Sequence, residues 1–63
     1  MLLYFTDATN QKQVAVNPTV VGAVFEVPEG PHVGKTAINT TIGSIIVEQS
    51  VIDVVGTLNG ALA

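Results

Sequence analysis

The residues with the clearest potential for chemistry are the glycines, histidine, lysine and threonine found between Gly30 and Thr36. A phosphate-binding P-loop needs four residues between its first glycine and its Gly-Lys-Thr triplet, so that backbone amides and the lysine surround the phosphates together. Here only residues 31–33 separate Gly30 from Gly34, and a strand-like pattern follows Thr36 where a P-loop opens a helix. The segment is therefore predicted to be a hairpin loop, not a nucleotide site.

His32 is the only histidine in the chain. A hydrolytic centre needs a nucleophile within reach of the histidine and an acid that orients the ring. Glu29 lies nearby in the sequence, but no recognisable nucleophile accompanies the two residues. A metal site would need further ligands at a recognised spacing, or ligands from several subunits around a shared axis. We therefore expect no metal site, and His32 is predicted to be an ordinary loop residue.

The carboxylates could supply an acid–base pair, but their positions do not favour one. They are spread along the chain, at Asp7, Glu26, Glu29, Glu48 and Asp53. Glu26 and Glu48 fall on predicted strands. Either of them could pair across a sheet with Lys12 or Lys35, an interaction that contributes little at a surface. The sequence therefore predicts a protein without enzymatic activity and without a cofactor.

The charge balance disfavours nucleic acid as a partner. The formal net charge is −3, with two lysines and no arginine, whereas a protein that grips phosphates needs a cationic face. Tyr4, Phe5 and Phe25 could stack on bases, but aromatic residues in the strands of a small domain more often belong to its core. A nucleic-acid-binding accessory protein is therefore kept as an alternative.

Length and composition predict one small domain, residues 1–63, that forms a homo-oligomer. A chain this short buries only about 60% of its unfolded surface, and it has no cysteine to form a disulfide. Hydrophobic residues make up 48% of the chain and charged residues 11%, which is more apolar material than one small interior holds. The longest apolar run, about five residues, is far shorter than a membrane span. Residues 1–3 lack the start of a signal peptide, so we expect a cytoplasmic protein.

Five short segments carry the β-branched and alternating pattern of strands. They are residues 2–6, 12–16, 23–27, 35–40 and 44–48. Asn17-Pro18 predicts a single turn over residues 18–21, because proline suits the first position of a helix. Residues 28–34, with two prolines and two glycines, are expected to form the longest loop. The predicted fold class is α+β: a small five-stranded antiparallel β meander with one C-terminal helix.

The C-terminal helix is indicated by a cap, an apolar stripe and a stop. Ser50 offers its hydroxyl to the first free amides, and Asp53 completes a pair of the capping-box type. The stripe consists of residues at helical spacing, namely Val51, Val54, Val55 and Leu58. Gly60 is expected to end the helix, with residues 61–63 as a frayed tail. The helix should cover one face of the sheet and leave the other face for a partner.

A series of short signals runs through most of the chain. It consists of Val16-Asn17-Pro18, Val21, Phe25-Glu26, Ile38-Asn39-Thr40, Gly43, Ile46-Val47, Glu48-Gln49-Ser50-Val51 and Asp53-Val54-Val55. In this order the signals resemble the FlbD/SwrD-type small flagellar and motility-associated proteins, and similar uncharacterised bacterial or phage proteins. The family pattern has Glu directly before Ser, whereas Gln49 stands between them here. The resemblance implies a compact β-rich interaction module without catalytic residues.

Together these observations predict a small non-enzymatic, homo-oligomeric regulatory or binding module that acts through protein–protein interaction. An apolar sheet face or an edge strand would accept the partner. The predicted contact region is the 28–34 loop with the strand residues beside it, and its residues are Val24, Phe25, His32 and Lys35. Two alternatives stay open: a nucleic-acid-binding accessory protein and a structural assembly component of phage origin.

Overall fold

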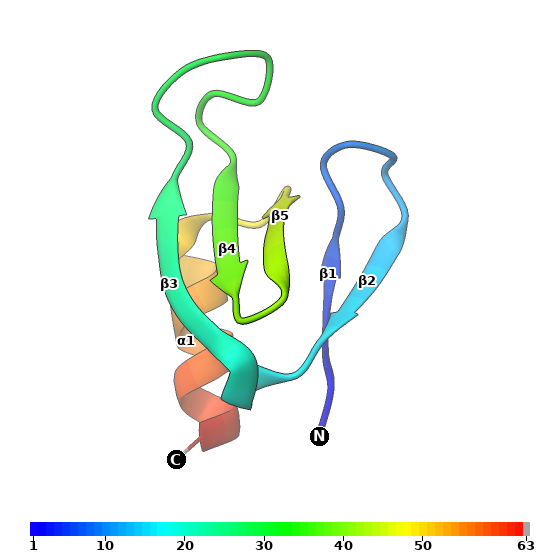
Figure 1. The fold of residues 1–63 in the computed structure, drawn as a ribbon, viewed down its shortest axis with the longest axis vertical. Coiled ribbons are helices and arrows are strands. Elements are labelled where there is room, and N and C mark those ends of the chain that lie inside the picture. Colours follow the sequence, from blue (N-terminus) through cyan, green and yellow to red (C-terminus); the bar gives the residue numbers. More distant parts are fainter. Residues whose placement is uncertain (63) are drawn as a thin grey trace.

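The structure is a computed structural model, and it describes residues 1–62. Its elements, in chain order, are β1 (Leu3–Thr6), β2 (Gln13–Val16), the 3₁₀ turn η1 (Pro18–Val20), β3 (Val21–Glu26), β4 (Thr36–Thr40), β5 (Gly43–Val47) and α1 (Val51–Leu62). The α+β class and the order of strands followed by a C-terminal helix are therefore confirmed (Figure 1).

The predicted single meander is only partly right, because the five strands form two sheets. β1 and β2 form a two-stranded antiparallel hairpin, and β3, β4 and β5 form a three-stranded antiparallel sheet with β4 in the centre. Within residues 1–62 the two sheets are joined by one antiparallel bridge, between Asp7 and Val47. On either side of this bridge, the Ala8 amide donates to the Ile46 carbonyl and the Glu48 amide donates to the Thr6 carbonyl, each at 2.8 Å. Beyond the bridge the two sheets separate (Figure 1).

The hydrophobic core lies where the two sheets and the helix face one another. Its fully or nearly buried residues come from both sheets and from α1, and they are Phe5, Val16, Ile38, Val47, Val54 and Leu58. Ile38, at the middle of the central strand, is completely buried. Thr36 is the buried polar residue beside them, and its hydroxyl donates a hydrogen bond of 2.6 Å to the Gln49 carbonyl.

The helix begins as the sequence predicts but ends later. The Ser50 hydroxyl accepts a hydrogen bond from the Asp53 amide at 3.1 Å, which confirms the cap. Gly60 does not stop the helix: positive φ angles occur at Gly30, Gly34 and Gly43 but not at Gly60, so the helix continues to Leu62. A glycine inside a helix costs only about 1 kcal/mol, which is too little to end it without a left-handed turn. Ala61 and Leu62 are therefore helical, and Ala63 lies outside the described residues.

The apolar stripe of the helix is narrower than the sequence predicts. Val54 and Leu58 are buried and Val51 is half-buried, whereas Val55 is 38% exposed. Residues four apart share one face of a helix, and Val55 lies on the flank of that face. In Figure 1 α1 runs behind β3, the strand that it contacts most. No helix within residues 1–62 combines the length and the apolar content that crossing a membrane requires.

Two predicted connections take the form that the sequence indicates. The Asn17 side chain accepts the Thr19 amide at 3.0 Å, and Pro18 opens the 3₁₀ turn, which ends one residue earlier than predicted, at Val20. The 28–34 loop continues the β3–β4 hairpin, because the Val27 amide donates to the Lys35 carbonyl at 2.8 Å. As expected, the loop leads into a strand, which begins at Thr36.

Candidate functional site

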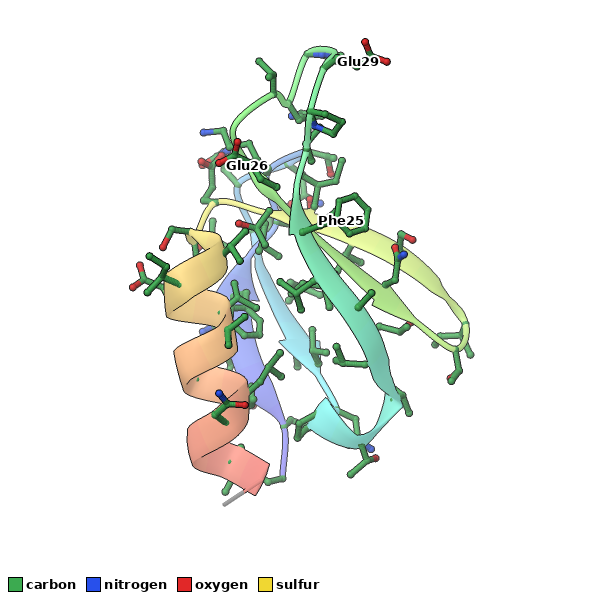
Figure 2. The ribbon with its side chains drawn as sticks, turned by 90° about the vertical axis from the view of Figure 1, so that its left-hand side faces the viewer. Phe25, Glu26 and Glu29 are labelled. Carbon is green, nitrogen blue, oxygen red and sulfur yellow. The ribbon has the colours of Figure 1, made fainter. Side chains whose placement is uncertain are left out.

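The structure distributes the sequence-predicted contact residues over different surroundings. Val24 is half-buried and packs against the core, whereas Phe25, the next residue on the same strand, is 44% exposed. Figure 2 shows Phe25 pointing away from α1, while Glu26 points toward the helix side. His32 is half-buried in the loop, and Lys35 is bound to a carboxylate. The structure therefore does not gather Val24, Phe25, His32 and Lys35 into one patch.

Lys35 belongs to a polar clamp, which we define as Gln11, Lys35 and Glu48. The Lys35 ammonium donates to Glu48 Oε1, and Gln11 Nε2 donates to Glu48 Oε2 at 2.6 Å. The clamp ties together the β1–β2 turn, the end of the 28–34 loop and the segment after β5. Of the pairs that the sequence left open between Glu26 or Glu48 and Lys12 or Lys35, the structure shows the pair of Glu48 with Lys35.

The hydrogen bonds of the clamp shift the acid–base behaviour of its carboxylate. The Lys35 ammonium, and after it the Gln11 amide, hold the pKa of Glu48 below its ordinary value of 4.5. The hydroxyl and the amide of Thr9 likewise lower the pKa of Asp7. The charge of His32 adds a smaller effect of the same direction on both carboxylates. Both oxygens of Glu48 are thus engaged in bonds between loops, which is a structural role.

Replacing Glu48 by glutamine is expected to weaken the fold near neutral pH and to have no charge-dependent effect in strong acid. Since the folded-state pKa is depressed, folding favours the ionised carboxylate. This stabilisation is complete above the ordinary value of 4.5 and is lost as the pH falls through the folded-state pKa. Urea unfolding of wild type and E48Q across this range measures the difference, which should shrink with acidification.

The matched control is Glu29→Gln, because Glu29 is an exposed carboxylate in the 28–34 loop (Figure 2). E29Q is expected to unfold like the wild type near neutral pH. If the effect of E48Q is the same at every pH, the charge of Glu48 contributes nothing and its role is limited to hydrogen bonding.

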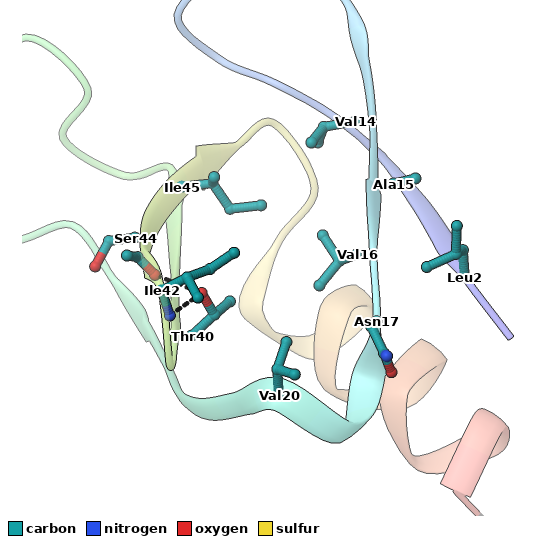
Figure 3. A pocket seen from close by; sticks show the side chains of 11 residues that line it. Leu2, Val14, Ala15, Val16, Asn17, Val20, Thr40, Ile42, Ser44 and Ile45 are labelled. Atoms are coloured by element: carbon teal, nitrogen blue, oxygen red, sulfur yellow. Dashed lines mark hydrogen bonds between the residues drawn. The ribbon is translucent and has the colours of Figure 1, made fainter.

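An apolar groove lies apart from the polar clamp, on the side of the β4–β5 turn. It encloses ≈ 520 Å³ between the β1–β2 hairpin and the β4–β5 hairpin. Its lining comes from three separated segments and is made of Leu2, Val14, Ala15, Val16, Asn17, Val20, Thr40, Ile42, Gly43, Ser44 and Ile45. None of these residues is charged. Figure 3 shows Val14 and Val16 on one side and Ile45 on the other, with their side chains directed toward each other across the groove.

The groove exists because the two sheets separate beyond the bridge of Asp7 with Val47. β5 is an edge strand of its sheet, and β2 is an edge strand of the hairpin. The apolar side chains of β2 and β5 that face the space between the two sheets are therefore left on an open surface. Ile42, in the turn between β4 and β5, stands on the rim and is 94% exposed.

A second, smaller hollow of ≈ 280 Å³ lies between β3 and α1. It is lined by Pro18, Val21, Gly22, Ala23, Val24, Val55, Leu58 and Asn59. Val24 is the residue of the predicted contact region that reaches it. Polar groups able to hold a metal are not gathered in either hollow, and residues 1–62 contain no group of three or more His, Asp or Glu side chains suited to a metal ion.

Sequence reasoning missed the groove because no single segment carries its signal. Val14 and Val16 alternate with polar or small neighbours, which predicts only that one face of the strand is buried. A bulky apolar residue at a hairpin turn, such as Ile42, was the one local signal, since turns usually carry polar residues.

Comparison of the chain with protein-family models, with curated proteins and with solved structures finds no match in any of the three. The resemblance to the FlbD/SwrD-type proteins therefore stays a prediction from the sequence.

Proposed function

We propose that this protein is a non-enzymatic binding module that acts through protein–protein contact at the apolar groove. The observation that carries the proposal is the uncharged groove between β2 and β5, two edge strands whose neighbouring side chains are apolar. An edge strand offers backbone hydrogen bonds to an extended segment, and apolar pockets beside it accept alternate side chains. A protein segment with alternating apolar residues meets both requirements.

The composition of the groove favours a protein segment over a small molecule. Its volume is within the range of ligand pockets, about 300–1,000 Å³, but such pockets also present a few convergent polar groups that fix the ligand. Here the polar side chains are Asn17, Thr40 and Ser44, and all three are engaged with the protein itself. Asn17 Oδ1 accepts the Thr19 amide at 3.0 Å. Thr40 Oγ1 donates to the Gly43 carbonyl at 2.7 Å, and Ser44 Oγ donates to Asn39 Oδ1.

The nucleic-acid alternative has less support. Binding to phosphates requires free cations, and one of the two lysines, Lys35, is bound to Glu48. Tyr4 and Phe25 are exposed aromatic residues, but they lie on different sheets.

Selection from a displayed random-peptide library tests the proposal. Wild-type protein is expected to enrich peptides with alternating apolar residues. Val14→Thr keeps the shape of the side chain but places a hydroxyl in the groove. This should lower the affinity for the selected peptides about tenfold, or by about 1.4 kcal/mol of binding free energy. Val33→Thr, at an exposed loop position, is the matched control and should bind them as the wild type does.

Two outcomes would contradict the proposal. One is a selection without enrichment, and the other is equal peptide binding by wild type and Val14→Thr. Binding of single-stranded oligonucleotides that weakens steeply with salt would instead support the nucleic-acid alternative.

A further inference from the structure

We propose that the partner of the groove is a second copy of this chain, and that Ile42 of each copy inserts into the groove of the other. The proposal rests on the proposed function, since it names the protein that occupies the same groove, here through a hairpin turn instead of an extended segment. It makes the protein a symmetric dimer in which the two grooves close each other.

The protruding part of this contact is Ile42. Its side chain is 94% exposed at the tip of the β4–β5 hairpin. The turn that carries it is fixed by the Thr40 hydroxyl, which donates to the Gly43 carbonyl at 2.7 Å and accepts the Ile42 amide at 3.3 Å (Figure 3). These bonds hold the backbone of the turn, so the turn loses little backbone entropy when Ile42 binds, which favours association.

The receiving part is the floor of the groove, formed by Val14, Val16, Val20 and Ile45. Ile42 stands on the rim of the same groove. A knob and a hole on one face are self-complementary under a twofold axis, because each copy then gives its knob and receives the knob of the other. An apolar side chain of this size suits a floor made of valine and isoleucine side chains.

The distribution of charge favours a second copy over an unrelated, charged partner. The chain has seven charged side chains, five acidic and two basic, and none of them lines the groove. They lie at the β1–β2 turn, at the end of β3 and in its loop, after β5, and in the first turn of α1. Figure 1 shows all of these segments in the half of the molecule away from the β4–β5 turn.

Two copies of net charge −3 repel each other unless their charged ends are kept apart. The Debye length is about 8 Å at physiological ionic strength, so repulsion between exposed charges falls off over that distance. Since no charged side chain lines the groove, contact through the groove does not press charged side chains of the two copies against each other.

A stable contact has to cover more than the floor of the groove. The accessible surface of the described chain is 3961 Å², and a stable interface buries about 800 Å² on each partner, or roughly one fifth of that surface. The apolar side chains of Leu2 and Ile42, which are 53% and 94% exposed, extend the contact beyond the floor. A domain of this size gains stability from such burial, because its own interior is small.

Sedimentation equilibrium of the full chain over micromolar to millimolar concentration tests the dimer. Wild type is expected to approach twice its mass of 6.5 kDa. Ile42→Glu should raise the dissociation constant at least about tenfold, because the lost apolar burial alone accounts for that change. Ile52→Glu is the matched control, since Ile52 is 83% exposed on α1 and lies outside the groove; it should dimerise like the wild type.

A second measurement locates the interface. The chain has no native cysteine, so oxidation of an equimolar mixture of Ile42→Cys and Val20→Cys should give the mixed disulfide dimer. A mixture of Ile52→Cys and Val20→Cys should not.

Each possible failure has a distinct meaning. A wild type that stays monomeric throughout overturns this proposal, while peptide binding that depends on Val14 would still support the proposed function. A dimer unaffected by Ile42→Glu places the interface elsewhere and also overturns it. If the wild type neither self-associates nor binds selected peptides, both this proposal and the proposed function are wrong.

Discussion

Replacing Ile38 by alanine is expected to lower the free energy of unfolding by about 2–5 kcal/mol, the usual cost of removing a large aliphatic side chain from a core. Ile38 is completely buried at the centre of the middle strand, between both sheets and the helix. At roughly 0.05–0.15 kcal/mol per residue, a chain of this length has a total stability of about 3–9 kcal/mol. The substitution therefore removes a large part of that stability, and the variant should be partly unfolded at room temperature.

Urea unfolding followed by circular dichroism measures this loss. The matched control is Ile52→Ala, the same substitution at a position that is 83% exposed, which should change the stability by less than about 0.5 kcal/mol. Similar losses for the two variants would mean that the core is not centred on β4.

The double substitution Gly56→Ala and Gly60→Ala is expected to raise the free energy of unfolding by about 1–2 kcal/mol. Each glycine lies inside α1, where it costs about 0.5–1 kcal/mol relative to alanine through its greater freedom in the unfolded chain. Both positions are exposed, and a Cβ atom added at either one meets no atom within 4 Å. Thermal unfolding should show a midpoint higher by about 4–8 °C per kcal/mol.

Gly43→Ala provides the matched control, because this substitution should lower the free energy of unfolding. A Cβ atom at Gly43 also meets no atom within 4 Å, but the residue has a φ of 145°, which disfavours any other amino acid. This substitution should therefore destabilise the protein by about 1–3 kcal/mol. The single variants Gly56→Ala and Gly60→Ala separate the two contributions to the free energy of unfolding. If the helix ended before Gly60, Gly60→Ala would give no gain in stability.

The parts of the fold that the sequence predicted correctly depend on interactions between near neighbours. Asn17 and Pro18 fix a turn within three residues, and Ser50 caps a helix that begins beside it. The alternation of strand residues is equally local. These signals placed every strand and the helix to within a few residues of their observed bounds.

The parts that the sequence did not predict depend on contacts between distant segments. The division into two sheets follows from the short bridge between Asp7 and Val47, which are forty residues apart in the chain. Neither residue carries a signal for that pairing. The predicted end of the helix was wrong because glycine permits a left-handed turn but does not require one.

The candidate site shows the same division. A pair between a lysine and a strand carboxylate was predictable because the chain has only two lysines and few carboxylates on strands, but only the structure shows that Lys35 and Glu48 form it. Gln49, the residue that interrupts the family pattern, has a role that only the structure shows: its side chain accepts the Thr6 amide at 3.0 Å and thereby holds β1 next to the helix start. The groove joins residues from β2, η1 and β5, so its existence depends on how far the two sheets separate.

The short bridge between the sheets also bears on the order in which the molecule opens. β4 is bonded on both sides by β3 and β5, whereas within residues 1–62 the ladder that joins the β1–β2 hairpin to the larger sheet is limited to the bridge at Asp7 and Val47. Protection of backbone amides from solvent exchange depends on the smallest unit that must open to expose them. The ladder therefore holds the hairpin weakly, and its main attachment is the burial of Phe5 and Val16 in the shared core. The amides of β4 are expected to be the best protected, because β4 is bonded on both sides and Ile38 at its middle is completely buried.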